Sequence, residues 1–301
     1  MNPRLCAIAL ALSAVVAVSA QTATSPAPAT MMTQDSVNVF RRFSVDRATV
    51  LAYYGDVIGL QTLSALNMPG GGQMSLFHIG TSQFKFTNAA AGRQDKSGPV
   101  LDVTGLRVFS FFYCSELEVA AKFTSHGYPA PDFHGTASRR SAMVTDPDGQ
   151  WVELAIRPCD KPMSHFEIGA TVSDLEKSRV FYRDFVGLEE LPAFESQYGK
   201  TYRFALGRLH RTDALNNVPD LWTWNILNLW AAHPGAAANT YTAGIQYVVS
   251  DVESVDARAK ANNVTIATPL GMFGAGLRTI WLGDPDGITN YFAQILSRTP
   301  R

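Results

Sequence analysis

The sequence has almost no net charge and no block of one sign. It holds 25 lysine and arginine residues against 26 aspartate and glutamate residues among 301, a formal net charge of −1. No basic stripe interleaved with aromatic residues occurs, and no acidic or basic run is present. We therefore expect no nucleic-acid partner and no polyelectrolyte tail.

A hydrophobic run long enough to cross a membrane is also missing. The apolar run Leu5–Val18 is only about 14 residues long, whereas a spanning helix needs roughly 20. Arg4 precedes this run, and Val18-Ser19-Ala20 supplies the small residues of a signal-peptidase site. The pattern predicts a signal peptide over residues 1–20, a secreted or periplasmic protein, and no membrane contact after cleavage. An uncleaved N-terminal anchor is the alternative.

Core-forming residues are scarce between this signal and the rest of the chain. Residues 21–36 are mostly Thr, Ser, Pro, Ala, Gln and Met, a composition that buries too little apolar surface to offset chain entropy. We expect a disordered leader there. About 265 residues of near-average hydrophobicity remain, enough for one large domain or two packed ones.

What the sequence does contain is an internal duplication. Ala52–Leu60 resembles Val180–Leu188, aromatic residue for aromatic residue and Gly-Leu for Gly-Leu. Asp146–Gly149, with the sequence Asp-Pro-Asp-Gly, recurs unchanged as Asp284–Gly287. The first pair is displaced by 128 positions and the second by 138. Two unrelated landmarks at nearly the same displacement predict a tandem duplication.

Each copy divides again into two similar units. Alternating strand residues at Ile168–Val172 lead to a capping Asp174, and apolar residues then recur at helical spacing until Gly187. Short apolar runs broken by Gly, Pro, Asn or Asp follow, as expected for three antiparallel strands. Asp-Pro-Asp-Gly forms the turn between the last two of them. The sequence therefore predicts a βαβββ unit four times over.

These segments resemble the vicinal oxygen chelate superfamily, which includes glyoxalase I, bleomycin-resistance proteins and extradiol dioxygenases. Val172–Leu188 and Asp146–Leu154 carry the most specific part of the resemblance, which covers nearly the whole chain after the leader. It implies an α+β fold of four βαβββ modules paired into two cupped half-barrel sheets. Consecutive modules would share a cup, so that residues 37–160 form the first domain and residues 163–297 the second.

The resemblance also implies where a divalent metal would lie. Family members hold it inside the cup with His, Gln or Glu from first strands and Glu from last strands. These positions hold Glu167 on a first strand and Glu153 on a last strand. The other positions fall on Val39 or Phe40, Lys85, Val108, Gly244 and Tyr291. Too few ligands remain for tight binding, so we expect at most a weakly held divalent metal at Glu167 or Glu153. A salt bridge between Glu153 and Lys85 is the expected arrangement in the first cup.

Three residues are candidate catalytic groups. Glu167 is predicted to point into the second cup, and His165, two residues earlier on the same strand, would face the same way. The pair could serve as acid and base or as part of a metal site, or His165 could be solvated at the strand entrance. Tyr291 would donate a hydrogen bond into the cup of Glu167, or be a core aromatic. Glu153 would point into the other cup.

Candidate ligand-binding residues are aromatic and basic, together with Glu153 in the first cup. Trp222, Trp224 and Trp230 share one strand face, where they would line a pocket for a flat apolar molecule or pack in the core. Arg140 and Arg278 hold matched positions before the two Asp-Pro-Asp-Gly turns. They would bridge to the turn aspartates or clamp a ligand carboxylate.

Two cysteines, Cys114 and Cys159, are left after signal removal, in a compartment where disulfides persist. In the family fold the first and last strands of a module run side by side. Equal steps from Val108 and from Glu153 would bring the two cysteines level, within reach of a disulfide. We predict that they are bonded; two separate buried thiols are the alternative.

The function predicted from the sequence is that of an exported protein which binds a small apolar or aromatic molecule without a tightly held metal. The alternative is a divalent-metal-dependent lyase, isomerase or dioxygenase that uses a degenerate site around Glu167. The resemblance supports the fold more strongly than either function. The sequence names no substrate and leaves the oligomeric state open.

Overall fold

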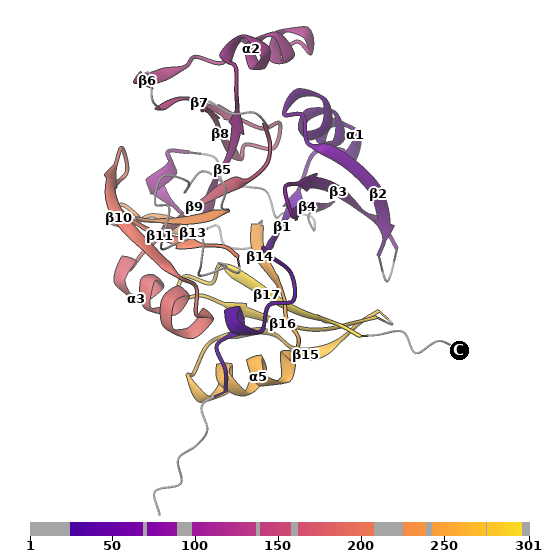
Figure 1. The fold of residues 1–301 in the computed structure, drawn as a ribbon, viewed down its shortest axis with the longest axis vertical. Helices are drawn as coiled ribbons and strands as arrows, with labels where there is room; N and C mark the ends of the chain where they lie inside the picture. The colour runs from indigo at the N-terminus through magenta and orange to yellow at the C-terminus, as the bar shows by residue number, and fades with distance from the viewer. Residues whose placement is uncertain are drawn as a thin grey trace, which may run out of the picture.

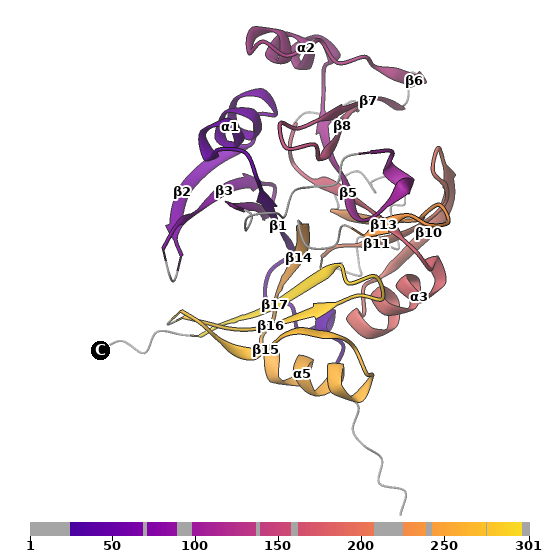
Figure 2. The same cartoon turned by 180° about the vertical axis from the view of Figure 1, so that it is seen from behind.

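Two curled sheets form the protein, one of eight strands and one of nine (Figures 1 and 2). The computed structural model describes residues 25–68, 71–88, 98–136, 139–157, 162–207, 225–238, 243–274 and 276–296. The predicted signal peptide lies outside these residues. The α+β class and the paired, cupped half-barrels predicted from the sequence are confirmed.

The βαβββ unit occurs four times, as predicted. The first module contains β1 (Asn38–Phe43), α1 (Arg47–Leu51) with a π-helical turn (Ala52–Val57), β2 (Gln61–Asn67), β3 (Gln73–Ile79) and β4 (Ser82–Asn88). The second contains β5 (Val103–Tyr113), α2 (Glu116–Ser125), β6 (His134–Thr136), β7 (Arg139–Thr145) and β8 (Trp151–Ile156). The third contains β9 (Phe166–Val172), α3 (Leu175–Val180) with a π-helical turn (Phe181–Val186), β10 (Glu190–Ser196), β11 (Gly199–Ala205) and β12 (Ile226–Ala231). The fourth contains β14 (Ala243–Val248), α5 (Val252–Ala261), β15 (Ile266–Phe273), β16 (Leu277–Gly283) and β17 (Thr289–Ile295). Short elements at Pro28–Met31, Val100–Asp102 and β13 (Ala237–Ala238) complete the described fold.

Each helix begins at a side-chain cap. The capping oxygen accepts a backbone N–H near the helix start, which stabilises a helix by about 1 kcal/mol. The caps are Asp46, Ser115, Asp174 and Asp251. The helices are short, and none within the described ranges is long and apolar enough to cross a membrane.

The pairing of the modules differs from the sequence prediction. The eight-stranded sheet has the order β15-β16-β17-β14-β1-β4-β3-β2. The nine-stranded sheet has the order β10-β11-β12-β9-β5-β8-β7-β6, and its ninth strand, β13, pairs with β5 outside this order. The first module therefore pairs with the fourth, through antiparallel β1 and β14, and the second pairs with the third, through antiparallel β5 and β9. We call the concave side of the second-and-third-module sheet cup A and that of the first-and-fourth-module sheet cup B. Consecutive pairing was wrong because the partner of each first strand is set by contacts between segments far apart in the sequence, which the pattern of the strand itself does not reveal.

The two sheets pack on one another through aromatic side chains. Phe84 on β4 contacts Phe109 and Phe111 of β5 and Phe166 of β9, with ring centroids 5.0 to 5.4 Å apart. All four rings are fully buried. Such ring pairs contribute about 0.5–1.5 kcal/mol beyond their buried area. The two cups are thereby fixed to one shared core.

Residues 25–36 were expected to be a disordered leader, and the structure corrects this. Met32 is 2% exposed in the core and forms a bridge with Val249, while Ser36 forms a bridge with Gly207. The Ser36 hydroxyl donates to the Leu206 carbonyl at 2.7 Å. A composition poor in apolar residues misleads here, because contacts with residues beside the third and fourth modules supply the burial that the segment cannot supply alone.

The two Asp-Pro-Asp-Gly turns are anchored differently. The Arg41 guanidinium, completely buried, lies 2.6 Å from the Asp146 carboxylate and 3.1 Å from that of Asp148. The residue of β9 that matches Arg41 of β1 is Ala170, which cannot pair with a carboxylate. Asp284 in the second turn therefore accepts hydrogen bonds from backbone N–H groups and from the Tyr182 hydroxyl, and no arginine takes the place of Arg41. Burial raises the pKa of Asp284 to about 7. One turn therefore carries a buried ion pair, and the other a carboxyl group that is partly protonated near neutral pH.

Candidate functional site

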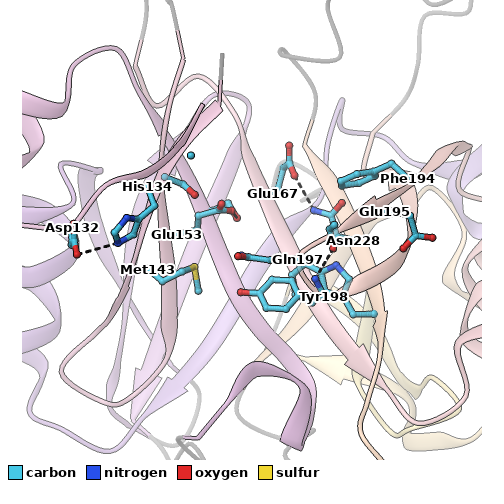
Figure 3. A pocket seen from close by; sticks show the side chains of 15 residues that line it. Asp132, His134, Met143, Glu153, Glu167, Phe194, Glu195, Gln197, Tyr198 and Asn228 are labelled. Carbon is cyan, nitrogen blue, oxygen red and sulfur yellow. Dashed lines mark hydrogen bonds and ion pairs between the residues drawn. The ribbon is translucent and has the colours of Figure 1, made fainter. Parts of the chain in front are cut away.

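A cavity of about 630 Å³ opens in cup A (Figure 3). Strands β5, β7, β8, β9 and β12 supply its inner wall, and the β10–β11 hairpin and the β6 region form its rim. Its apolar surface comes from Met143, Phe194, Tyr198 and Trp230. The volume lies within the range of small-molecule sites.

Glu153 and Glu167 face this one cavity, although they were predicted to point into different cups. Ser110 on β5 lies level with Glu153 on β8 and with Glu167 on β9, so the strand register brings the three together. The correction follows from the pairing of the second module with the third. Figure 3 shows both carboxylates directed into the cavity.

Glu167 is buried and already has partners. The Arg157 guanidinium lies 3.2 Å from its Oε1, and the Asn228 amide donates to its Oε2 at 2.8 Å. Burial alone would raise the pKa of Glu167, but Arg157 and Asn228 hold it below its ordinary value. Glu167 is therefore an ionised, salt-bridged carboxylate and not a proton donor at neutral pH.

His165 does not form the predicted acid–base pair in the cup. Its ring stacks on Phe112 at 4.3 Å, and its Nε2 lies 3.3 Å from an Arg157 nitrogen. Burial, with help from the Arg157 charge, lowers the pKa of His165 to about 4. The ring is 5% exposed and is not part of the cavity wall, so the solvated alternative is also wrong. Its part is to support Arg157, whose guanidinium lies 3.7 Å over Phe112.

Glu153 has a different environment. It is half-buried, and its Oε2 accepts a hydrogen bond from Ser110 Oγ at 2.7 Å. The salt bridge predicted with Lys85 does not form, because Lys85 lies on β4 in the other sheet. Within the described ranges no lysine or arginine pairs with Glu153. Of the two carboxylates at the inner wall, Glu167 is paired with an arginine, whereas Glu153 has no lysine or arginine partner among the described residues.

Two buried polar atoms at the cavity wall are unmatched. The Asn228 Oδ1 and the Trp230 Nε1 have no hydrogen-bond partner among the residues that the structure describes. Both side chains are 6% exposed. The Trp230 ring lies against Gly169, where a Cβ would come within 2.0 Å of it, and contacts Tyr198 at 4.5 Å between centroids. Of the three predicted tryptophans, Trp230 lines the cavity, whereas Trp222 and Trp224 lie outside the described residues.

Cup B carries different side chains at the matched places. In cup A, Ser110 lies level with Glu167 on one neighbouring strand and with Glu153 on the other. In cup B, Gln246 takes the place of Ser110 and lies level with Asn38, in the place of Glu167, and with Tyr291, in the place of Glu153. Lys85 takes the place of Asn228, and its Nζ donates to Gln246 Oε1 at 2.6 Å. Burial lowers the pKa of Lys85 to about 8. The prediction that Tyr291 shares a cup with Glu167 is therefore wrong.

Aromatic rings fill much of cup B. Tyr291 contacts Trp281 at 4.9 Å and Phe40 at 6.3 Å. The Phe40 ring occupies the space where a Cβ at Gly244 would lie, at 2.3 Å. Burial raises the pKa of Tyr291 to about 12, so it stays protonated. Trp281 on β16 lies level with Tyr291 in cup B, and Met143 on β7 lies level with Glu153 in cup A. Trp281 of cup B therefore holds the place of Met143 in cup A.

Neither donor set fits the metal that the family resemblance implies. In cup A, the carboxylate of Glu167 is already bound by Arg157 and Asn228, and the carboxylate of Glu153 accepts a hydrogen bond from Ser110. The described part of the chain contains no group of three His, Cys, Asp or Glu residues placed to hold a metal ion. In cup B the matched places hold no carboxylate at all, and one holds an ammonium group. Cations of this kind require several anionic or neutral donors around one point.

The remaining predicted site residues lie elsewhere. Arg140 pairs with Glu116 of α2, and Arg278 pairs with Glu253 of α5. Each arginine therefore links a strand to the helix of its own module, and neither lines the cavity. His134 is exposed at the cavity rim, 3.0 Å from Asp132.

Cys114 is disulfide-bonded. Cys159 lies outside the described residues, so the predicted pairing stays a prediction. The register used for it was two residues off, because Glu153 is level with Ser110 rather than with Val108.

Sequence reasoning missed Ser110 and Asn228. Glu167 lies seven residues before its helix cap, Asp174, and the same distance on β5 gave Val108 as the matching position. Ser110, the residue that is level with Glu167, lies only five residues before its own cap, Ser115. Asn228 follows a stretch outside the described residues and carried no motif. Its alternation with Trp230 was the available signal.

Comparison with known proteins agrees with this architecture. Residues 163–292 match a model of the Glyoxalase/Bleomycin resistance protein/Dioxygenase superfamily. Glyoxalase I from Zea mays is 19% identical, with a TM-score of 0.66 over 87% of this chain and 92% of that one. A Bacillus subtilis protein named as a dioxygenase is 15% identical, with a TM-score of 0.59 over 89% of this chain and 86% of that one. No curated protein matches the chain in sequence. At these identities the solved structures establish the fold.

Proposed function

We propose that this chain, of which residues 163–292 match the model of the Glyoxalase/Bleomycin resistance protein/Dioxygenase superfamily, is an exported protein that binds a small, flat apolar or aromatic molecule in cup A without a tightly held metal. The cavity of about 630 Å³ carries the proposal. Its aromatic and thioether side chains suit a planar ring, whereas at the matched place cup B carries Trp281, which packs against Phe40.

A cavity-filling exchange between the cups tests this function. Met143→Trp places in cup A the side chain that cup B carries at the matched place, and we expect it to weaken binding of indole at least about tenfold. The matched control, Trp281→Met, alters cup B and leaves binding unchanged. Isothermal titration calorimetry with indole measures both. Unchanged binding in Met143→Trp, or equal losses in both variants, would contradict the proposal.

A second candidate function is a lyase, isomerase or dioxygenase that uses a weakly held divalent ion. One observation favours it, namely that Glu153 and Glu167 face the same cavity. Metal analysis of the mature protein separates the two candidates. Stoichiometric iron, manganese or zinc would favour the enzyme, and its absence after purification without chelators would favour the binding protein.

A further inference from the structure

We propose that cup A selects a positively charged aromatic ligand, an arylalkyl ammonium ion, over neutral and anionic molecules of the same shape. This inference rests on the proposed function and names the chemical class of its ligand. It follows from the charges at the cavity wall, from one unmatched acceptor and from the contrast with cup B.

Among the described residues that line the cavity there are acids and no lysine or arginine. Glu153 and Glu167 lie at its inner wall, and Asp132 and Glu195 lie at its rim. Arg157 pairs with Glu167, the charge of Arg203 also helps to lower the pKa of Glu167, and His134 is beside Asp132. Glu153 is left as the inner carboxylate without a cation among the described residues. A ligand that fills the cavity removes water from this carboxylate, and such desolvation is costly unless the ligand supplies a positive charge.

Asn228 adds an acceptor to the same wall. Its amide nitrogen is committed to Glu167, which fixes the orientation of the amide, and its Oδ1 is the atom left without a donor. A buried acceptor without a partner costs about 1–3 kcal/mol. A ligand N–H group removes that cost, whereas a ligand carboxylate or carbonyl cannot.

The aromatic part of the cavity suits the same ligand. Tyr198 and Trp230 lie 4.5 Å apart between centroids at an interplanar angle of 50°, and so present two ring faces. Ring faces attract cations as well as flat apolar groups. An arylalkyl ammonium ion would place its ring against Met143 and Trp230 and its charge at Glu153.

Cup B shows that the scaffold does not require this charge. At the places of Glu153 and Asn228 it carries Tyr291 and Lys85. At these two places, therefore, the carboxylate and the amide are found in cup A and not in cup B. The ammonium group of Lys85 in cup B lies where an ammonium ligand would meet Asn228 in cup A.

Three probes with one ring system test the inference. Tryptamine is cationic, 3-ethylindole is neutral and indole-3-acetate is anionic, and calorimetry on the whole mature protein at about pH 7 compares them. We expect tryptamine to bind on the order of tenfold more tightly than 3-ethylindole, and indole-3-acetate to bind most weakly. In Glu153→Gln, which keeps the side-chain shape, tryptamine should lose its advantage. Glu189→Gln, an exposed acid outside the cavity, is the control and should leave the order unchanged.

Each outcome decides one of the two proposals. Equal binding of tryptamine and 3-ethylindole, or tighter binding of indole-3-acetate, overturns the charge selection and leaves the proposed function standing. Absence of binding by all three probes overturns both. Persistence of the tryptamine preference in Glu153→Gln overturns the role of Glu153. Stoichiometric Mn²⁺ that displaces tryptamine would assign the carboxylates to a metal and overturn the inference as well. Circular dichroism confirms that each variant is folded.

Discussion

The two sheets share one strand plan and differ in the groups at matched places. Cup A carries Ser110, Glu153, Glu167 and Asn228 around an open cavity, while cup B carries Gln246, Tyr291, Asn38 and Lys85 with aromatic rings between them. The turns differ in the same way, since the cup A sheet has an arginine-paired Asp146 and the cup B sheet an Asp284 without such a partner. Backbone register fixes where the side chains meet, and residue identity decides the charge and the space that result.

Removal of Arg41 should have the largest effect. Arg41→Met leaves the buried Asp146 carboxylate with only neutral donors, the situation of Asp284, and we expect it to lower the free energy of unfolding by about 3–5 kcal/mol. Urea denaturation at neutral pH measures this. A loss under about 1 kcal/mol would show that the two turns do not differ in this respect.

Asp284 predicts a pH dependence specific to the second turn. Its pKa in the folded protein is raised to about 7, from an ordinary value of 3.8. The folded state therefore binds more protons than the unfolded state between these values, so this carboxyl stabilises the fold fully below about pH 3.8 and less as the pH rises to about 7. Asp284→Asn should remove this slope, worth about 2–4 kcal/mol across the window.

Thermal unfolding of Asp284→Asn and of the unaltered protein from acidic to neutral pH supplies the measurement. The variant should be the more stable protein at pH values near or above 7. Identical slopes in the two proteins would refute the prediction.

Substitution of Glu167 should affect stability more than substitution of Glu153. Glu167→Gln leaves the Arg157 guanidinium without its carboxylate, and we expect a loss of about 1–3 kcal/mol. Glu153→Gln, with no ion pair to break, should change stability by less than about 0.5 kcal/mol. Chemical denaturation of both variants tests the contrast. A larger loss in Glu153→Gln would mean that the partners have been assigned the wrong way round.

The smallest effect is expected from metal removal. Since the described residues of neither cup form a fitting donor set, dialysis against a chelator should change the melting temperature by less than about 1 °C. Differential scanning calorimetry before and after dialysis measures it. A marked fall that added Mn²⁺ or Zn²⁺ restores would mean that one of the cups holds a metal.

Local features of the fold could be predicted from the sequence, and long-range ones could not. Asp174, Asp251 and the repeated Asp-Pro-Asp-Gly turn act within a few residues of themselves, so their pattern is sufficient. The partner of each module depends on contacts between segments far apart, about which a module's own pattern says nothing.

The candidate site was predicted only in part for the same reason. Glu153, Glu167 and Trp230 line the cavity as candidates, but their grouping required the pairing of β5 with β9. His165 shows a further limit. Its alternation with Glu167 suggested a shared face, but Phe112 and Arg157 hold its ring outside the cavity wall. The alternation of residues along a strand predicts which face a side chain points to, but the neighbouring side chains determine what it contacts.

The interleaved pairing also constrains the order in which the chain can fold. Asn38 and Gln246, which are neighbours across β1 and β14, are 208 residues apart in sequence. The second and third modules can pair as soon as β9 is available, whereas β1 exposes an open edge until the last module arrives. Contacts of such large separation form slowly and leave strand edges prone to aggregation. Translocation that keeps the chain unfolded until its last module emerges would spare the first module that exposure.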